Sequence, residues 1–206
     1  MSDSLVQFRP TEAMRVEAMA LMEQKEPEPE HATQVRELSL SLFDQLGERH
    51  GLGEGARFVL EAAALLHDIG WSQAPDGRKH HKLAYQMILS HAWETVPGEV
   101  VTLIALVARY HRKAVPHRDH EGYGELGAAD QEVVRKLAAL LRVADALDRS
   151  HQSRVIAIAA EAKPGKIAFR LTACHTCGAE LALVETKKDL FEDVFRTPLE
   201  CVVQGR

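Results

Sequence analysis

The chain has 206 residues, of which 46% are hydrophobic and 27% are charged, and its formal net charge is −5. This composition is typical of a folded globular protein and excludes a disordered chain, and the net negative charge argues against nucleic acid as a partner. No apolar run reaches about 18 residues, so we expect no membrane span. The polar N-terminus, through Glu12, lacks the apolar stretch of a signal peptide, so we expect a cytoplasmic protein.

Helical spacing of apolar residues dominates the chain up to residue 152. Asp130 is the expected N-cap of the last and longest of these helices. Gly70 follows an Ala- and Leu-rich segment and suits a helix C-terminus. The expected helices span residues 11–24, 30–50, 56–66, 80–93, 98–111 and 130–150.

The pattern changes near Arg154, where β-branched and polar residues alternate around a Lys-Pro-Gly turn. This alternation predicts a β-hairpin. We expect a third strand over 179–185, a short helix over 187–195 and a last strand over 199–203. The expected fold is therefore mostly α: a helical bundle at residues 1–152, followed by a small α+β appendage at residues 153–206.

His67 and Asp68 are adjacent at the end of the Ala- and Leu-rich helix. An ionised aspartate at the edge of a core is costly unless a cation or hydrogen-bond donors compensate it. Imidazole and carboxylate together are natural ligands for a divalent transition metal. His31 begins an earlier helix, and Asp145 lies on an apolar helix face four residues after Leu141. Four such ligands on separate helices can hold a metal in a bundle core.

Each of these residues also has an ordinary structural interpretation. A His-Asp doublet occurs at many helix C-termini, and a lone His31 is simply a polar residue at a helix start. Asp145 alone can form an ion pair with Arg142 or Arg149. Only the combination of the four residues in this order points to a metal site.

Further histidines extend the pattern. His80 and His81 open one helix and His111 closes the next, so that a second ion, bridged to the first by Asp68, fits the same site. Which of His80 and His81 is a ligand stays open, and both can be solvated residues at a helix N-terminus. The expected cofactor is one or two divalent ions of Mn, Fe, Co, Ni, Zn or Mg. Surface or loop positions are expected for His50, His91, His117 and His120.

The order of these residues resembles the H…HD…D pattern of the HD superfamily of metal-dependent phosphohydrolases. Longer segments resemble the C-terminal half of the exopolyphosphatase and guanosine pentaphosphate phosphatase (Ppx/GppA) family, over roughly residues 30–205. The resemblance implies an HD-type helical domain with that family's small last domain. The segments are HHKLAY at 80–85, ARYHRKA at 108–114 and LLRVADALDRSH at 140–151.

The chain departs from its relatives in informative ways. Full-length Ppx/GppA members carry an N-terminal actin-like region with their phosphatase site. These 206 residues have no room for it, so exopolyphosphatase activity is not expected to carry over. Trp71 replaces the lysine that follows HDIG in the cyclic-dinucleotide phosphodiesterase branch, and the Glu-Asp pair of stringent-response hydrolases is missing. The intact His67-Asp68 doublet makes the HD site itself the expected catalytic site.

The expected activity is metal-dependent hydrolysis of a phosphoester or phosphoanhydride in a phosphorylated small molecule, with a nucleotide as the expected substrate. Asp68 is expected to bridge two ions or to orient the attacking water. Arg112, Lys113 and Arg149 are candidates to neutralise the phosphoryl charge, with a solvated basic face as the alternative. The alternative function is a non-catalytic or regulatory module that binds a nucleotide or alarmone in the same cleft.

The three cysteines do not form the even-numbered framework of a secreted protein. Cys174 and Cys177 form a CxxC segment, but a structural zinc site requires four ligands, and only His175 and Cys201 remain to complete it. We interpret this segment as a loop between strands. A homodimer contact is an alternative to packing on the bundle for four apolar residues of the first helix. They are Met14, Met19, Leu21 and Met22.

Overall fold

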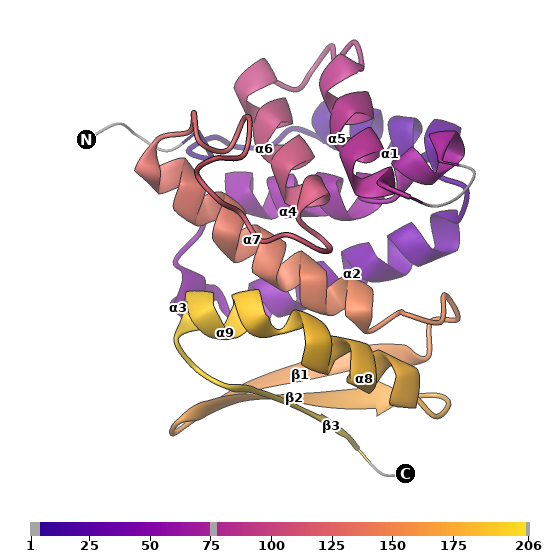
Figure 1. Ribbon diagram of the computed structural model, residues 1–206, viewed down its shortest axis with the longest axis vertical. Coiled ribbons are helices and arrows are strands. Elements are labelled where there is room, and N and C mark those ends of the chain that lie inside the picture. Colours follow the sequence, from indigo (N-terminus) through magenta and orange to yellow (C-terminus); the bar gives the residue numbers. More distant parts are fainter. Residues whose placement is uncertain (1–4, 75–77, 205–206) are drawn as a thin grey trace.

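The computed structural model describes residues 5–74 and 78–204. A helical bundle forms most of the molecule, and a small sheet lies at one end (Figure 1), which confirms the predicted mostly α fold with a small α+β segment at the C-terminus. The bundle contains α1 (Glu12–Lys25), α2 (Pro29–Gln45), α3 (Gly47–His50), α4 (Glu54–Leu66), a 3-10 helix η1 (Ile69–Gln73), α5 (His80–Ser90), α6 (Gly98–Arg109) and α7 (Ala128–Ala146). The remaining elements are β1 (Val155–Lys163), β2 (Lys166–Ala173), α8 (Gly178–Lys187), α9 (Asp189–Phe195) and β3 (Leu199–Val203).

Helix α4 lies at the centre of the bundle and packs against α1, α2, α6 and α7 (Figure 1). Ala62, Ala63 and Ala64 are fully buried in its middle, and their small side chains let neighbouring helices approach closely. Leu65 and Leu66 are buried in its last turn. The central position of α4 therefore carries the end of the helix, with the His-Asp doublet, into the interior of the bundle.

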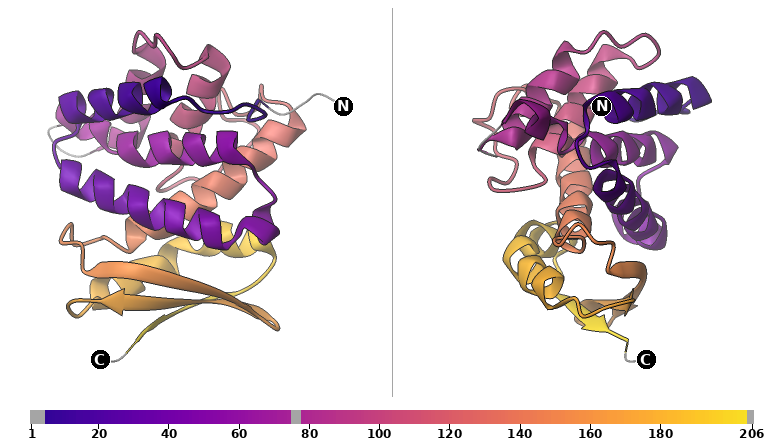
Figure 2. Two further views of the ribbon diagram at one scale, coloured as in Figure 1. Left: turned by 180° about the vertical axis from the view of Figure 1, so that it is seen from behind. Right: turned by 90° about the vertical axis from the view of Figure 1, so that its right-hand side faces the viewer.

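Helix α7 joins the bundle to the C-terminal elements. It contacts α2, α4 and α6, and also α8 and α9, and Figure 2 shows it between the other helices and the sheet. The buried guanidinium of Arg142 donates to the backbone carbonyls of Tyr110 and Lys113, and it pairs with Asp189. This arginine fixes the loop after α6 against the start of α9. The division into domains at residue 152 stays a prediction.

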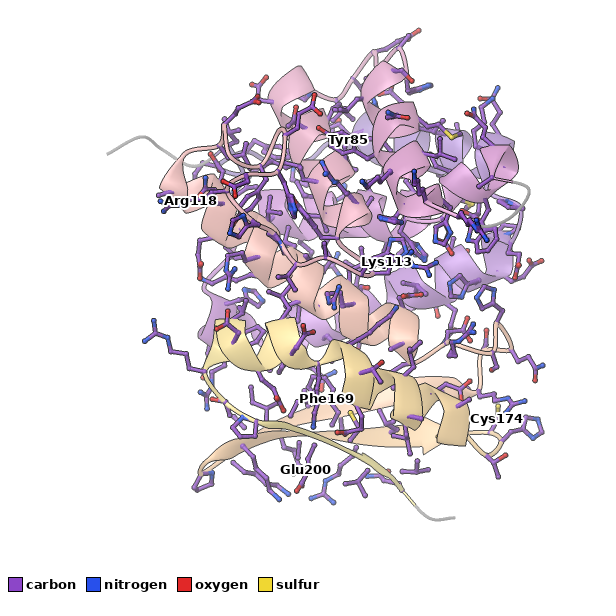
Figure 3. All side chains as sticks on the ribbon, in the orientation of Figure 1. Tyr85, Lys113, Arg118, Phe169, Cys174 and Glu200 are labelled. Carbon is purple, nitrogen blue, oxygen red and sulfur yellow. The ribbon has the colours of Figure 1, made fainter. Side chains whose placement is uncertain are left out.

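The three strands form a sheet in the order β1-β2-β3. β1 and β2 are antiparallel and close at Lys163 and Lys166, whereas β2 and β3 are parallel. Gly165 in the turn has a φ of +77°, which glycine adopts without strain. The predicted hairpin and last strand are confirmed. Phe169 of β2 packs edge-on against Phe191 of α9, between the sheet and the helices (Figure 3).

The strand predicted over 179–185 is wrong, because this segment is helical and belongs to α8. Leu181 and Leu183 alternate with other residues and imitate a strand pattern. The buried positions are instead Glu180 and Val184, which lie four residues apart on one helix face. Glu180 accepts a hydrogen bond from the backbone N–H of Ser150, so the helix is anchored to the end of the bundle.

Three details of the bundle also differ from expectation. Gly127, rather than Asp130, is the N-cap of α7, and Asp130 accepts a hydrogen bond from the backbone N–H of Leu5. The helix predicted over 30–50 is divided at Leu46 into α2 and α3. His50 is buried instead of exposed. Its burial depends on contacts between segments, which the local sequence does not reveal.

Helix α1 packs on the bundle through most of its apolar residues. Met14, Leu21 and Met22 are buried, and Met19 is half-buried. Packing on the bundle therefore accounts for the first three of these residues without a partner chain. Within residues 5–74 and 78–204, no helix combines the length and the apolar character needed to cross a membrane.

Candidate metal centre

Six side chains that could ligate metal meet in two neighbouring groups. In each group the potential ligand atoms lie within 4.8 Å of one another. The residues come from α2, from the end of α4, from the start of α5, from the turn after α6 and from the last turn of α7. The first group is His31, His67 and Asp145, and the second is Asp68, His80 and His111.

In the first group, two imidazoles face one carboxylate oxygen. Nε2 of His31 lies 3.6 Å from Oδ1 of Asp145, and Nε2 of His67 lies 3.8 Å from the same oxygen. Nδ1 of His31 hydrogen-bonds to Asp148 at 2.8 Å, and Nδ1 of His67 hydrogen-bonds to the carbonyl of Ala64 at 2.7 Å. Both Nε2 atoms are buried and have no hydrogen-bond partner among the described residues. Such an arrangement is typical of histidine ligands, whose other ring nitrogen is held by an acceptor.

The carboxylate of Asp145 is stabilised by positive charge. Burial raises the pKa of Asp145, but Lys187 and His31 hold it well below its usual range, so the carboxylate is ionised. Burial lowers the pKa of His31, but the neighbouring carboxylates of Asp145 and Asp148 outweigh it and raise this pKa to about 10. The Nζ atom of Lys187 forms an ion pair with Oδ2 of Asp145. A divalent ion would satisfy the same carboxylate and the unpaired Nε2 atoms, so the donor set fits a metal.

Asp68 belongs to the second group and also faces His67 of the first group. Its Oδ1 is 3.2 Å from Nε2 of His80 and 3.4 Å from Nε2 of His111, and its Oδ2 is 3.7 Å from Nε2 of His67. Burial raises the pKa of Asp68, but the neighbouring imidazoles, with His67 first, outweigh it and lower the pKa. Each oxygen of one ionised carboxylate therefore faces a different group, which is the geometry required of a bridging ligand.

The three histidines at and beside the second group, His80, His81 and His111, differ in their surroundings. Burial holds the pKa of His111 well below its usual value, so the ring is neutral, as a metal ligand must be. His80 lies in the group, whereas the neighbouring His81, although buried, joins neither group in the described part of the chain. Burial and then His80 lower the pKa of His81 to about 4. The role of His81 as a ligand stays a prediction.

A close backbone contact positions the second group. Gly70 lies in η1, and a Cβ atom placed there would be 2.1 Å from the carbonyl oxygen of His80. The absence of a side chain at Gly70 lets the start of α5 approach η1 closely, so that the ring of His80 can reach Asp68. The sequence predicted a helix C-terminus at Gly70, but α4 ends at Leu66 and Gly70 lies inside η1 without a positive φ. Its role in the structure is this close packing.

A cavity of about 380 Å³ opens on both groups. Among the predicted basic residues, Arg112 and Arg149 line it, and Nη1 of Arg112 lies 3.0 Å from Nε2 of His80. Lys113 is exposed and is not among the described residues that line this cavity (Figure 3). The lining of the cavity thus combines ionised carboxylates and imidazoles with cationic side chains.

The sequence did not assign four residues that the structure places here. Asp148 holds His31; its sequence signals are its position three residues after Asp145 and its place in the family-like segment 140–151. His151 stacks on His31, with ring centroids 3.8 Å apart. Lys187 comes from α8, and no sequence pattern links it to the bundle. The fourth is Trp71, which lines the cavity beside Asp68.

The comparisons with known proteins agree with this architecture. A family model described as Ppx/GppA phosphatase, domain III, matches residues 15–192. The chain belongs to this family. The matched region includes the helices that carry both groups, and also α8. The match begins earlier in the chain than the resemblance over roughly residues 30–205 indicated. The comparison with curated proteins finds no match.

The CxxC segment lies between the sheet and α8. Cys174 follows β2 and Cys177 precedes α8, so the loop joins a strand to a helix rather than two strands (Figure 3). Both cysteines are free, as is Cys201. Among the described residues, none of the three belongs to a group that could hold a metal ion.

Proposed function

We propose that this Ppx/GppA domain III protein is a metal-dependent phosphohydrolase of the HD type, acting on a phosphoester or phosphoanhydride of a nucleotide-like compound. The observation that carries the proposal is the position of Asp68, whose two oxygens face two buried groups of potential ligands. Asp68 lines a cavity whose lining also includes cationic side chains. Membership of a family described as phosphatases supports the reaction class.

His31, His67 and Asp145 would hold one divalent ion, and Asp68, His80 and His111 a second. Ions in such a site polarise a phosphoryl oxygen and lower the pKa of water toward neutrality. Each group contains two imidazoles and one carboxylate, a set that favours Mn, Fe, Co, Ni or Zn over Mg, which prefers oxygen ligands. Asp68 would keep both groups at a fixed separation.

The cationic side chains would act on the substrate. Phosphoryl transfer places negative charge on the equatorial oxygens, and positioned cations stabilise that charge. Arg112, Arg149 and Lys187 line the cavity and can reach a phosphate bound there. We assign no direct role to Lys113, because its exposed side chain lies outside the lining that the structure describes.

The test combines metal content with turnover. The purified protein is expected to bind Mn²⁺, Co²⁺ or Ni²⁺ and to release phosphate or a nucleoside phosphate from a panel of nucleotides. Asp68→Asn preserves the shape of a bridging residue but removes its charge, and it should abolish turnover. Asp119→Asn, on an exposed loop, is the matched control and should behave as the wild type. A protein that binds none of these metals would overturn the proposal.

A regulatory module that binds a nucleotide without hydrolysing it is the second candidate. The observation in its favour is that a cationic side chain of the protein already contacts one residue of each group: Arg112 contacts His80, and Lys187 contacts Asp145. Tight retention of metal and nucleotide without product in the same panel would favour this function.

A further inference from the structure

The two edges of the small sheet differ in their surroundings. β1 is one edge, and α2 covers it, because the side-chain amide of Gln45 donates to the carbonyl of Ile158 and accepts from the N–H of Ala160, both at 2.8 Å. Gln34 of the same helix donates to the carbonyl of Val155. Unpaired backbone groups at a sheet edge invite another strand, so these side chains protect β1 from pairing along this stretch.

β3 is the other edge, and Figure 1 and Figure 2 show it at the end of the molecule farthest from α5 and α6. Its pairing with β2 begins where the N–H of Ile167 donates to the carbonyl of Pro198, and it ends where the N–H of Gln204 donates to the carbonyl of Leu171. In a parallel ladder, alternate residues of a strand direct both backbone groups toward the same neighbour. The even-numbered residues of β3 therefore bond to β2, and the odd-numbered residues direct their N–H and C=O groups outward.

The outward-facing residues of β3 are only partly covered. The N–H of Leu199 donates to Oε1 of Glu192 at 2.9 Å, and its carbonyl accepts from Nζ of Lys188 at 3.1 Å. The outward N–H and C=O groups of Cys201 and Val203 form no hydrogen bond within the part of the chain that the structure describes. Two donors and two acceptors in a row are therefore left for water or for another strand.

Val202 lies between these two residues, and its side chain is 52% exposed. Natural edge strands commonly carry lysine or proline at such a position, which prevents pairing. The neighbouring Glu200 forms an ion pair with Lys166 of β2 at 2.6 Å, so its charge is already balanced within the sheet. An unpaired stretch of backbone with an apolar residue at its centre has the properties of an edge to which a strand is added.

We propose that β3 pairs with β3 of a second copy of this chain, antiparallel about a two-fold axis that passes beside Val202, so that the two sheets become one. In this register Cys201 lies opposite the partner's Val203, and each such pair exchanges both of its hydrogen bonds. All four outward groups of each copy are then satisfied, and Leu199 keeps its own partners. Val202 faces the partner's Val202 in the closely spaced pair that lies between the hydrogen-bonded ones.

The pattern of free groups favours a second copy over a strand of another protein. The same three residues supply both halves of the contact, because the donors and acceptors of Cys201 match those of Val203 when the strand is turned by 180°. A two-fold interface requires this kind of self-complementary surface. The contact involves neither ligand group of the metal centre, so it is independent of the proposed function.

Sedimentation velocity of the full chain, from micromolar to millimolar concentration, tests the association. The wild type should pass from monomer to dimer as its concentration rises. Val202→Lys places two like charges opposite each other at the two-fold axis and should weaken the dimer by at least about tenfold. Val203→Pro removes one outward N–H but no bond to β2, and it should have a similar effect. Ile156→Lys is the matched control, at a residue of β1 that is 57% exposed, and it should dimerise as the wild type does.

A cross-link tests the register. Val202→Cys places two thiols opposite each other in a pair close enough for a disulfide. Diamide, which takes up the two electrons and two protons that the thiols lose, should convert this variant into a covalent dimer on a non-reducing gel. Ile156→Cys should stay monomeric on the same gel. The wild type should also stay monomeric, because Cys201 faces the partner's Val203 in this register and not the partner's Cys201.

The two measurements together decide the inference. A chain that is monomeric at every concentration would overturn it, and so would a dimer that both β3 variants leave unchanged, since the copies would then meet through another surface. Equal cross-linking of Ile156→Cys and Val202→Cys would overturn it as well. If a β3 variant loses its fold, as circular dichroism would reveal, selective cross-linking of the folded Val202→Cys protein still decides between these results. None of the outcomes depends on metal binding or turnover.

Discussion

His31 donates a hydrogen bond from Nδ1 to Oδ2 of Asp148 over 2.8 Å, and both side chains are buried. The other oxygen of Asp148 accepts from the backbone N–H of Ser153, also at 2.8 Å, so the carboxylate is fixed from two sides. This contact turns Nε2 of His31 toward Asp145, 3.6 Å away. A carboxylate behind a histidine ligand fixes the ring and increases its basicity. In the proposed metal site, Asp148 is therefore a positioning residue for His31.

The first prediction concerns this positioning. Asp148→Asn should weaken metal binding by about 10- to 100-fold, the usual effect of losing such a partner. Competition with a coloured chelator measures the affinity. Because the ligands themselves remain, saturating metal should restore kcat, whereas general structural damage would not be rescued in this way. Asp193→Asn, at an exposed residue that pairs with Arg135, is the control. An unchanged metal affinity would argue against the prediction.

The second prediction concerns stability. A metal that binds only the folded state should raise the free energy of unfolding by about 2.7 kcal/mol at a concentration 100 times Kd. Urea unfolding with Mn²⁺ and with a chelator measures this increment. Asp68→Asn should remove most of the increment, because the bridging charge is lost. The same increment in this variant would show that the metal binds elsewhere.

The sequence predicted which of these side chains come together because their helices are strongly patterned. His67 and Asp68 end an apolar helix, and Asp145 lies on the buried face of another, so their convergence follows from packing those faces together. His50 could not be predicted in the same way. Its burial depends on the carbonyl of Phe43, which becomes an available acceptor only when α2 and α3 are separate helices.

Lys187 shows a second limit of prediction. The alternating pattern before it suggested a strand, and a strand would not have carried this lysine to Asp145. Its position depends on the packing of α8, whose buried residues are Glu180 and Val184, against α7. Those contacts join segments far apart in the chain, and local periodicity contains no information about them.

The third prediction concerns the contact between Gly70 and α5. Gly70→Ala would place a Cβ atom 2.1 Å from the carbonyl oxygen of His80 and 2.6 Å from the backbone nitrogen of Ala84, so the start of α5 must move. We expect a loss of about 1–3 kcal/mol in stability, as for other overpacked sites. Metal content should also fall, because His80 moves with the helix. Gly98→Ala is the control, since nothing lies within 4 Å of a Cβ there. Equal stability of both variants would contradict the predicted contact.

The fourth prediction concerns pH. Burial lowers the pKa of His50, whose neutral ring donates from Nε2 to the carbonyl of Phe43 and accepts at Nδ1 from the N–H of Leu52. Because the folded pKa is below the unfolded value of about 6.5, the contribution of His50 is complete above that pH and is lost as pH falls through the folded pKa. His50→Gln should cost about 1–2 kcal/mol at neutral pH.

Urea unfolding of both proteins between neutral pH and about pH 5 checks the sign, since an unperturbed histidine titrates within this range. The wild type should lose more stability on acidification than His50→Gln, so the difference between them should narrow. The comparison cancels the titration of the other groups that both proteins share. A difference that widens on acidification would contradict the assigned direction of the pKa shift.

The last prediction concerns Lys187, which pairs with Asp145 and lines the cavity. If its charge stabilises the reacting phosphate, Lys187→Met should lower kcat by about 100-fold, as the loss of one preorganised donor does. Metal content should be kept, and Lys187→Arg should recover part of kcat. Lys25→Met is the matched control, because Lys25 is an exposed lysine in the last turn of α1. Loss of metal with an unchanged kcat at saturating metal would instead make Lys187 a positioning residue for Asp145.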